Sequence, residues 1–323
     1  MRSIALLVLM AACGDNLPAV PFESYAAARR HAECERQVRC GLFSTLDACE
    51  AYTYLIPDRS LEKAIADGRV VYSEDAALRC IHTLSAVTCD GSTGAARDEP
   101  EPCAGVFRGT LEIGATCAFD AECATDRCMQ TGCDPSTCCA GACVPQGPNA
   151  VGSACTLDRD CARTAYCALD RTCHALGNDG ATCYRDAECA DGLGCVIATN
   201  PGICRPLAAS GTACPYGRCA LVGERCNSAA TCEPYARAGD SCWQDTDCSP
   251  SGFCDAGTCA NLPGPGMPCT RRCEGAAYCD ASVQQCRARK ENSAPCAADF
   301  ECATGYCAEA EPYDFCSDRP VCD

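Results

Sequence analysis

Cysteine is the residue type that most constrains this chain. There are 39 cysteines among 323 residues, a share typical of disulfide-bonded scaffolds. Only one Trp, seven Phe and four Met accompany them, which is too little large apolar side chain to fill one core for the whole chain. We therefore expect several small units held by disulfides, because such units bury too little apolar surface to fold without cross-links.

The first residues predict export. Arg2 precedes an apolar run over residues 4–10, and Met10-Ala11-Ala12 places small residues directly before Cys13. This order resembles the signal of bacterial lipoproteins, in which the cysteine is lipidated and becomes the first residue of the mature chain. A secretory signal without lipidation shares the small-residue pattern and is the alternative.

The cysteine count agrees with lipidation of Cys13. Without Cys13 the 39 cysteines become 38, an even number that can pair completely. We expect residues 1–12 to be a signal peptide, Cys13 to carry the membrane anchor, and residues 13–23 to form a tether. The predicted location is extracytoplasmic, at an outer membrane or the cell surface.

Residues 24–108 predict a small all-α domain with disulfides. Ser24, Ser44 (with Asp47 three residues on), Asp58 and Ser73 are candidate helix caps, and Gly68 is a candidate stop. An apolar stripe of Ala77, Leu78, Ile81 and Leu84 follows the last cap. Six cysteines are expected to form three bonds in a pairing that the sequence leaves open: Cys34, Cys40, Cys49, Cys80, Cys89 and Cys103.

Residues 109–323 contain seven tandem cysteine-rich modules. They begin with Cys117, Cys155, Cys183, Cys214, Cys242, Cys269 and Cys296. From Cys173 onward, ten positions separate the last cysteine of a module from the first cysteine of the next. A disordered linker tolerates changes in length, so this constancy predicts ordered junctions.

A glycine stands three residues before the first cysteine of six modules, which predicts a turn with positive φ. These glycines are Gly114, Gly152, Gly180, Gly211, Gly239 and Gly266. The last module has Ser293 instead, so we expect a different turn there. We also expect little regular secondary structure in the array beyond short β-hairpins.

Crossed pairing of the first cysteine with the third and the second with the fourth is expected in each middle module. Bonds between sequence neighbours would leave two separate small loops, whereas crossed bonds stack the disulfides into a core; each closes a loop of about a dozen residues, worth on the order of 3 kcal/mol. The expected bonds are Cys155–Cys167, Cys161–Cys173, Cys183–Cys195, Cys189–Cys204, Cys214–Cys226, Cys219–Cys232, Cys242–Cys254, Cys248–Cys259, Cys269–Cys279 and Cys273–Cys286. The first and last modules have odd cysteine counts, and their extra partners stay open.

An acidic pattern, D-x-[DE]-C, precedes the second cysteine of five modules. Its acids are Asp120 and Glu122, Asp158 and Asp160, Asp186 and Glu188, Asp245 and Asp247, and Asp299 and Glu301. One interpretation is a row of calcium sites, but two carboxylates fall short of the six to eight oxygens that calcium takes. The favoured interpretation is that the first acid closes a turn by accepting backbone N–H bonds while the second faces solvent.

The run from Gly114 to Cys123, closed by Thr137-Cys138-Cys139-Ala140-Gly141-Ala142-Cys143, resembles the cysteine-rich repeats of the Dickkopf N-terminal and EB-module type. The whole chain resembles cysteine-rich lipoproteins of myxobacteria and related bacteria. The repeat resemblance covers about residues 114–322 and depends on cysteine spacing. It implies the crossed pairing given above and transfers no role in receptor signalling.

Enzyme chemistry finds little support in the sequence. His31, His82 and His174 lie in unlike contexts, and no C-x-x-C, H-E-x-x-H or G-x-S-x-G motif occurs. We therefore expect no enzyme activity, no cofactor and no metal centre. The net charge of −17 disfavours nucleic acid as a partner.

Two classes of function remain from the sequence. The first is an anchored binding or adhesion protein whose varied loops between the third and fourth cysteines contact a protein or glycan. The second is a structural spacer with no specific ligand, and a protease-inhibitor array is a weaker third interpretation.

Overall fold

A computed structural model of the chain describes most of it beyond the first residues. Within it, an N-terminal group of helices is followed by short antiparallel hairpins cross-linked by disulfides. This is the fold class expected from the sequence. Cys13 and the rest of the expected signal lie outside the described residues, as do Cys133, Cys138, Cys139 and Cys322. The described residues are 19–53, 58–89, 103, 105–129, 140–145, 147, 149–155, 158–162, 164–197, 200–270, 272–308 and 314–318.

In the helical head, as we call residues 19–110, the described residues form four α-helices and one pair of strands. The helices are α1 (Phe22–Arg39), α2 (Leu46–Tyr52), α3 (Arg59–Ala66) and α4 (Glu74–Ala86). The strands, which the sequence pattern did not indicate, are β1 (Val70–Tyr72) and β2 (Phe107–Gly109), paired antiparallel.

Two predicted caps are confirmed in the helical head. Asp58 Oδ1 accepts the N–H of Leu61 at 3.0 Å, and Ser73 Oγ accepts the N–H of Ala76 at 3.3 Å. Each side chain satisfies a backbone donor that the first helical turn leaves without a partner. Gly68 follows the end of α3 with φ +74°, as expected of a helix stop.

The other two cap predictions were wrong by one or more residues. α1 begins after Pro21, and Ser24 lies in its first turn with its hydroxyl donating to the Pro21 carbonyl. Proline enters a helix readily because it has no N–H to leave unpaired. Thr45, next to Ser44, caps α2 by accepting the N–H of Ala48 at 3.1 Å, and both residue types suit that position.

The core of the helical head lies between α1 and α4. Tyr25 and Ala32 from α1 are buried with Ala77 and Leu84 from α4. Tyr25 also joins an edge-to-face aromatic cluster with Phe22, Tyr72 and Phe107, with ring centroids 5.5–6.3 Å apart. Three disulfides complete the head, in a pairing that the sequence had left open: Cys34–Cys49, Cys40–Cys89 and Cys80–Cys103.

Every module is built on an antiparallel hairpin that places its third cysteine opposite a later one. In module two, for example, Cys167 lies across from Cys173. The hairpin strands are β4 (Cys128–Met129) with β5 (Gly141–Cys143), β6 (Ala165–Cys167) with β7 (Cys173–Ala175), β9 (Leu193–Val196) with β10 (Gly202–Pro206), β11 (Glu224–Cys226) with β12 (Cys232–Pro234), β13 (Gly252–Asp255) with β14 (Thr258–Asn261), β15 (Ala277–Asp280) with β16 (Gln285–Ala288), and β17 (Cys307–Ala308) with β18 (Phe315–Cys316). In modules one and three, β3 (Thr116–Cys117) and β8 (Thr182–Cys183) add a third strand.

The two cysteines that face each other across a hairpin are not bonded to each other. Each bonds instead to a cysteine in the segment before the hairpin, so the two disulfides cross, and the ten bonds of the middle modules are the same pairs that we expected from the sequence. The first and last modules follow the same rule with Cys117–Cys128, Cys123–Cys143, Cys296–Cys307 and Cys302–Cys316.

At four junctions, adjacent residues form backbone hydrogen bonds to the module before and to the module after. The N–H of Leu176 bonds back to the Thr164 carbonyl at 2.9 Å, while the next residue, Gly177, bonds forward to Glu188 at 2.7 Å. The same change of direction between adjacent residues occurs at 207–208, 235–236 and 289–290. The prediction of ordered junctions is therefore confirmed.

The recurring turn before each first cysteine has positive φ in all seven modules. Gly180, for example, has φ +88° and donates its N–H to the Cys204 carbonyl at 3.0 Å. The expectation of a different turn at Ser293 was wrong. Ser293 has φ +69° and donates to the Cys316 carbonyl at 2.7 Å, so the hydrogen bond to the last cysteine of the hairpin holds serine in the conformation that glycine adopts elsewhere.

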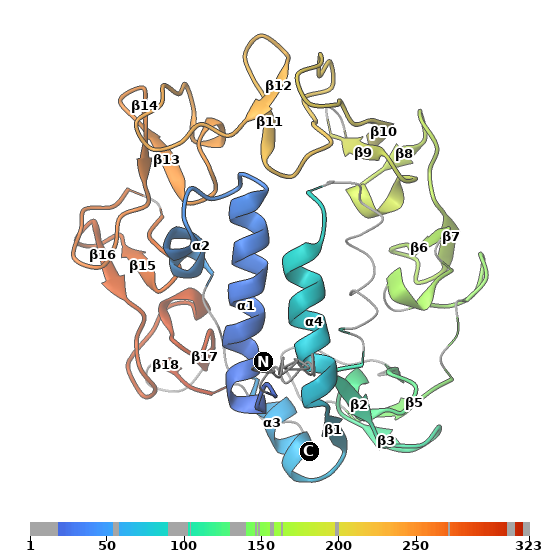
Figure 1. Cartoon of the computed structure of the whole chain (residues 1–323). Helices are drawn as coiled ribbons and strands as arrows, with labels where there is room; N and C mark the ends of the chain where they lie inside the picture. Colours follow the sequence, from blue (N-terminus) through green and yellow to red (C-terminus); the bar gives the residue numbers. More distant parts are fainter. Residues whose placement is uncertain are drawn as a thin grey trace, which may run out of the picture.

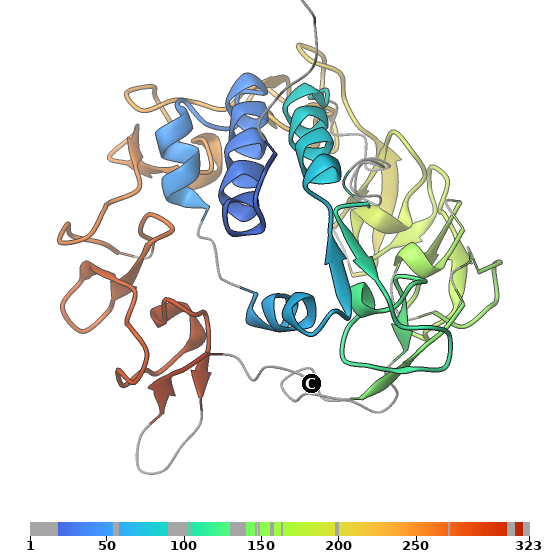
Figure 2. The same cartoon turned by 60° about the horizontal axis from the view of Figure 1, so that its bottom comes forward.

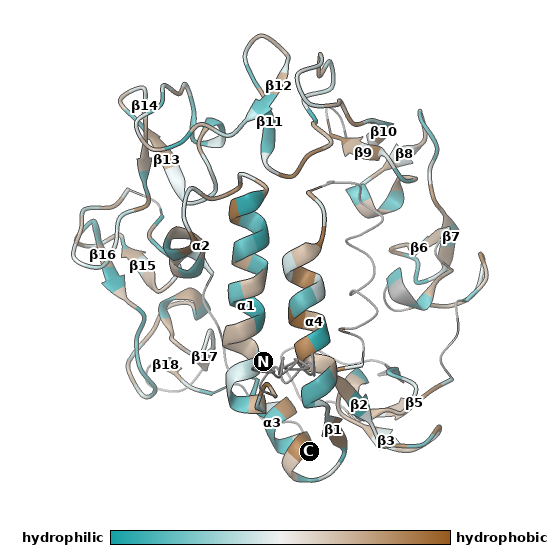
Figure 3. Cartoon of the chain, viewed as in Figure 1, coloured by the Kyte–Doolittle hydropathy of each residue, from teal (hydrophilic) through white to brown (hydrophobic). Residues whose placement is uncertain are grey.

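The modules curve around the helical head instead of extending away from it. Figure 1 shows the arc from β3 to β18 surrounding α1 and α4, and the turned view in Figure 2 shows the same enclosure. In Figure 3 the hydrophobic residues of the arc are scattered over short strands with hydrophilic residues between them. In the part of the chain that the structure describes, no helix is long and apolar enough to span a bilayer.

Contacts from modules one, four, six and seven hold the arc on the head. Arg69 pairs with Glu122 of module one. The N–H of Val222 in module four bonds to the Cys89 carbonyl at 3.4 Å. Two more are Arg272 Nη2 of module six to the Tyr52 hydroxyl at 3.3 Å and Arg59 to Asp318, beyond β18, at 3.2 Å.

Modules four and six also require a glycine where they meet the head. A Cβ at Gly223 would lie 1.7 Å from the Cys40 carbonyl oxygen, and one at Gly275 would lie 2.1 Å from that of Tyr52. Backbone therefore packs directly on backbone where modules four and six meet the head, and any larger residue would separate the two surfaces.

Candidate functional site

The first acid of the D-x-[DE]-C pattern binds the hairpin of its own module. In module two, Asp158 Oδ1 accepts the N–H of Cys167 at 2.9 Å. The same bond to the third cysteine recurs from Asp120, Asp186, Asp245 and Asp299, at 2.7–3.0 Å. The expected role as an acceptor of backbone N–H is thus confirmed, although the donor lies eight or nine residues away and not in a local turn.

The second acid is not solvated as we expected. Glu122, Asp160, Glu188 and Asp247 are all buried, at 0–6 % exposed. Glu122, Glu188, Asp247 and Glu301 each accept the N–H of the residue four positions earlier, at 2.6–3.2 Å. The sequence pattern hides this burial because the donors precede the motif, in the loop after the first cysteine.

Asp247 shows the electrostatic consequence. Burial acts to raise the pKa of Asp247, but the N–H bonds from Trp243 and Gln244 and the charge of Arg225 outweigh it and hold that pKa below its usual value. The carboxylate is therefore charged at neutral pH, and its oxygens are already taken up by protein donors. This arrangement closes a loop and leaves little of the ligand capacity that a calcium site would use.

Cations from neighbouring segments pair with these acids and link the modules. Arg127 and Arg225 each stand directly before a third cysteine and reach the next module, contacting Asp160 at 3.4 Å and Asp247 at 2.7 Å. Pairs also run backward: Arg185 of module three binds Asp158 of module two, and Arg218 of module four binds Asp186 of module three. Asp247 is buried and has both N–H and cation partners, so its pair with Arg225 is costly to disrupt and links modules four and five firmly.

Arg218 and Arg272 stand in the two modules that lack the acidic pattern. Arg218 also reaches the carbonyl of Cys195, and Arg272 binds the Pro250 carbonyl at 3.2 Å as well as Tyr52. In those modules the position before the second cysteine therefore carries a contact to a neighbouring segment.

The hairpin tips of modules two to six are mostly exposed and differ in sequence from one module to the next. Most tips turn through a residue with positive φ, as at Arg171 (+60°), Ala230 (+55°) and Gln284 (+52°). In Figure 1 the hairpins β11–β12 and β13–β14 extend away from the helices. We define the hairpin tips by their described residues in modules two to six, which are 168–172, 197 with 200–201, 227–231, 255–258 and 280–285.

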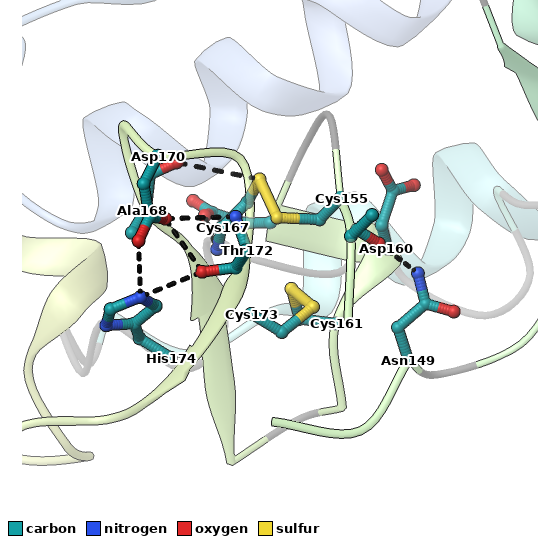
Figure 4. The surroundings of a disulfide bond; sticks show 12 residues. Asn149, Cys155, Asp160, Cys161, Cys167, Ala168, Asp170, Thr172, Cys173 and His174 are labelled. Carbon is teal, nitrogen blue, oxygen red and sulfur yellow. Dashed lines mark hydrogen bonds and ion pairs between the residues drawn. A yellow bond between two sulfur atoms is a disulfide. The ribbon is translucent and has the colours of Figure 1, made fainter. Parts of the chain in front are cut away.

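The tip of module two is tied to its core through the backbone, since the Arg171 carbonyl accepts the N–H of Cys155 at 2.9 Å, while its side chains lie outside the core. Figure 4 shows the disulfides Cys155–Cys167 and Cys161–Cys173 side by side below a network at Asp170. Asp170 accepts from the Thr172 backbone at 3.0 Å and lies 3.0 Å from His174 Nε2. Leu169 is 90 % exposed, so its side chain contributes nothing to packing.

Apolar side chains are exposed at several other points of the arc. Trp243, directly after the first cysteine of module five, is also 90 % exposed, and Ile197 is 66 % exposed. Neither position belongs to a core cluster. Sequence composition alone did not indicate that the single tryptophan would lie on the surface.

The remaining candidates for chemistry lie apart. His31 and His82 are exposed on α1 and α4, as expected, and His31 contacts Glu50 at 2.7 Å. Cysteine sulfurs gather in threes within 4.8 Å in several modules, but these sulfurs are in disulfides and have no thiolate to offer a metal. No family model, curated protein or solved structure matches this chain.

Proposed function

We propose that this chain is an exported binding protein, anchored to a membrane through a lipid on Cys13, whose hairpin tips contact a protein or glycan. Cross-links throughout the described residues are typical of proteins that fold in an oxidising compartment. The lipid anchor rests on Met10-Ala11-Ala12-Cys13 and on the even number of cysteines that remains without Cys13.

The observation that carries the proposal is the contrast between framework and tips. The crossed disulfides, the turn before the first cysteine and the ordered junction repeat along the arc. The tips that these elements carry differ in length and composition, and most of their described residues are exposed. A constant framework with variable loops is the usual arrangement of binding scaffolds, because loops carry recognition and the scaffold positions them.

The course of the array supports binding over the spacer alternative. A spacer provides reach, and reach requires modules arranged end to end. Here the array returns to the head, with module six at Tyr52 and Asp318 at Arg59. The turned tips also differ from the extended segments that insert into a protease cleft, so the inhibitor interpretation is not favoured.

Cross-linking and pull-down of the anchored protein on its own membrane tests the proposal. Tip variants Leu169→Ser and Ile197→Ser are expected to reduce capture of a partner without loss of folding, since neither side chain packs in a core. Glu291→Gln, on an exposed residue of the last junction, is the matched control. Capture that is insensitive to every tip exchange but varies with the number of modules would favour the spacer.

The anchor has its own test. Metabolic lipid labelling is expected in the wild-type chain and absent from Cys13→Ala, which should move to the aqueous phase on detergent partition. A Cys13→Ala variant that stays in the detergent phase would contradict lipidation of this residue.

A further inference from the structure

Exposed aromatic side chains occupy corresponding loops of three consecutive modules. Tyr184 in module three is 56 % exposed, Tyr216 in module four is 43 % exposed and Trp243 in module five is 90 % exposed. Each stands one or two residues after the first cysteine of its module. Tryptophan is highly buried on average in folded proteins. Exposed apolar side chains that gather in one place mark interaction surfaces, whereas single ones need no explanation.

The three loops adjoin one another. Arg218 of module four pairs with Asp186 of module three, and both residues line, together with Gln244 of module five, a cavity of about 530 Å³ along module four. Each of these lining residues lies within two positions of the aromatic residue of its own loop. The aromatic residues therefore belong to one surface, which we call the aromatic loops and define as residues 184–188, 215–218 and 243–247.

Two of the rings stand on backbone that the acidic pattern holds in place. The N–H of Tyr184 donates to Glu188 Oε2 at 2.7 Å, and the N–H of Trp243 donates to Asp247 Oδ2 at 2.8 Å. Both acids are buried. Rings presented from fixed backbone lose little conformational freedom when a partner binds, which is one reason why Tyr and Trp contribute strongly to protein interfaces.

The surface around these rings carries excess negative charge. Residues 176–261, which form modules three to five with their junctions, contain ten acidic residues, five arginines and no lysine. Arg237 is exposed, and the other four arginines are already in ion pairs: Arg185, Arg205, Arg218 and Arg225. Asp240 and Asp245, on either side of Trp243 in the sequence, are exposed and form no ion pair within the described residues. A cationic partner is therefore attracted to this surface and an anionic one is repelled.

The chain itself shows what such rings bind. The guanidinium carbon of Arg205 in module three lies 5.3 Å from the ring centroid of Tyr216 in module four. Arg272 of module six stacks in the same way on Tyr52 of the head, at 5.9 Å. In both cases the cation and the ring come from different units of the fold, so cation–π stacking is one way in which these units contact one another.

Tyr184 and Trp243 have neither a ring nor a cation stacked against them within the described residues. Phe300, in the corresponding loop of module seven, differs in this respect, because its ring packs near Tyr278 with the centroids 6.3 Å apart. The rings of Tyr184 and Trp243 thus offer to a partner the kind of contact that Arg205 makes with Tyr216 inside the chain.

We propose that the aromatic loops bind a basic segment of a partner protein, whose arginine or lysine side chains stack on Trp243 and Tyr184 and pair with Asp240 and Asp245. Because the loops belong to three successive modules, an extended segment can contact all of them. The aromatic loops are separate from the hairpin tips, so this inference goes beyond the proposed function.

Titration of the full oxidised chain with basic peptides, followed by the fluorescence of Trp243, tests the proposal. Trp243 is the only tryptophan of the chain, so its emission reports on this surface alone. The probes are oligoarginine and oligolysine peptides, with oligoglutamate and neutral cellohexaose for comparison. We expect oligoarginine to bind and to change the emission, and oligolysine to bind more weakly, because guanidinium groups stack on aromatic rings more readily.

Variants separate stacking from a general attraction between opposite charges. Trp243→Ala and Tyr184→Ala are each expected to weaken the binding of oligoarginine roughly tenfold, as measured by calorimetry, whereas Trp243→Phe keeps a ring and should lose less. All three keep the backbone N–H that the buried acid accepts. Leu169→Ala removes an equally exposed apolar side chain outside the aromatic loops and should leave the affinity unchanged.

Three results would overturn the assignment. The first is no binding of oligoarginine by the wild-type chain. The second is binding that Trp243→Ala and Tyr184→Ala leave intact, which means attraction by net charge alone. The third is a change of emission with cellohexaose and none with oligoarginine, which assigns the loops to a glycan. Partner capture that depends on the hairpin tips is independent of all three, so the two proposals fail separately.

Discussion

The helical head and the modules are both cross-linked, but their disulfides occupy different surroundings. In the head, Cys80–Cys103 lies in a core that also contains Tyr25, Leu84 and Val106. In module three the core cluster is four cysteines, with Leu193 packed against them. The head thus adds disulfides to an apolar core, whereas in a module the disulfides are the core.

This difference shows what a short repeat gains from crossed bonds. Two crossed disulfides bring four cysteines together as the buried cluster of the module. They also fix the hairpin to the preceding segment, which backbone bonds in strands of two to five residues would hold only weakly. Cysteine therefore supplies both the packing and the connectivity of each module.

The largest expected effect comes from a matched pair of disulfides. Cys34–Cys49 in the head and Cys189–Cys204 in module three both have a sequence separation of 15, so the chain-entropy model assigns each about 3 kcal/mol. We expect Cys189→Ala/Cys204→Ala to unfold module three as a unit, because little apolar packing remains. Cys34→Ala/Cys49→Ala should retain α1 and α2 around Phe43.

Hydrogen exchange with mass spectrometry distinguishes the two variants. Protection should vanish across residues 177–206 in the module variant and persist in α1 and α2 of the head variant. Equal loss of protection in both regions would show that the head depends on its disulfides as fully as a module does.

The next effect concerns the contact between the two regions. Gly223→Ala places a methyl group against the Cys40 carbonyl and is expected to cost about 2 kcal/mol by forcing the backbones apart. Small-angle scattering should show a larger radius of gyration, since module four leaves the head. Gly147→Ala, where a Cβ meets nothing within 4 Å, is the control; an unchanged radius for Gly223→Ala would argue against the close docking.

Positive-φ glycines give a smaller effect that should be equal in the two regions. Gly68 in the head (φ +74°) and Gly180 in module three (φ +88°) both have open space where a Cβ would lie, so alanine is expected to cost about 1 kcal/mol at each through backbone strain alone. Ser293→Gly should stabilise module seven by a few tenths of a kcal/mol or leave it unchanged. Chemical denaturation followed by local exchange measures all three; a large loss for Ser293→Gly would mean that its side chain has a role of its own.

The smallest effect is the pH dependence of two aspartates. The pKa of Asp247 is lowered from 3.8 although burial opposes the shift, and the pKa of Asp67 in the head is lowered by its hydrogen bonds to Lys63 and Arg69. A group whose pKa is lowered by folding stabilises the protein at pH values above its ordinary pKa. This stabilisation is lost as the pH falls through the folded-state pKa. We expect Asp247→Asn to flatten the acid side of the melting curve more than Asp67→Asn, because exposed pairs such as that of Asp67 contribute little.

Melting temperatures of the two variants, recorded from neutral pH to below pH 3.8, test whether Asp247 contributes more than Asp67 to the loss of stability in acid. Asp255→Asn, on an exposed residue of the same module, controls for the change of net charge. Equal flattening by Asp67→Asn and Asp247→Asn would indicate that burial does not matter here.

The framework of the modules was predictable because cysteine spacing carries it. Crossed pairing follows from the need to join two loops into one core, and constant junction length indicates order. Cap positions were correct for Asp58 and Ser73, where one capping residue stands alone before the helix. They failed at Ser44 because Thr45 beside it serves equally well.

The features that were missed depend on contacts between distant segments. Burial of Glu122 needs Arg69 from the head and the N–H of Ala118, and neither stands in the motif. The Ser293 turn depends on a bond to Cys316, and serine gives no local sign of it. The curvature of the array depends on Gly223 and Gly275, which resemble any other glycine in the sequence. The links between modules did leave a signal in the sequence, namely the arginines directly before two of the third cysteines.

The hydrogen-bonded junctions limit how the number of repeats can change. Duplication or loss of one repeat is a common recombination event in tandem arrays and is tolerated where modules hang freely. Here, each added or deleted module would rotate every later one, so that the glycines of modules four and six no longer meet Cys40 and Tyr52. The number of repeats is therefore tied to the size of the head, because a change in that number would break both contacts.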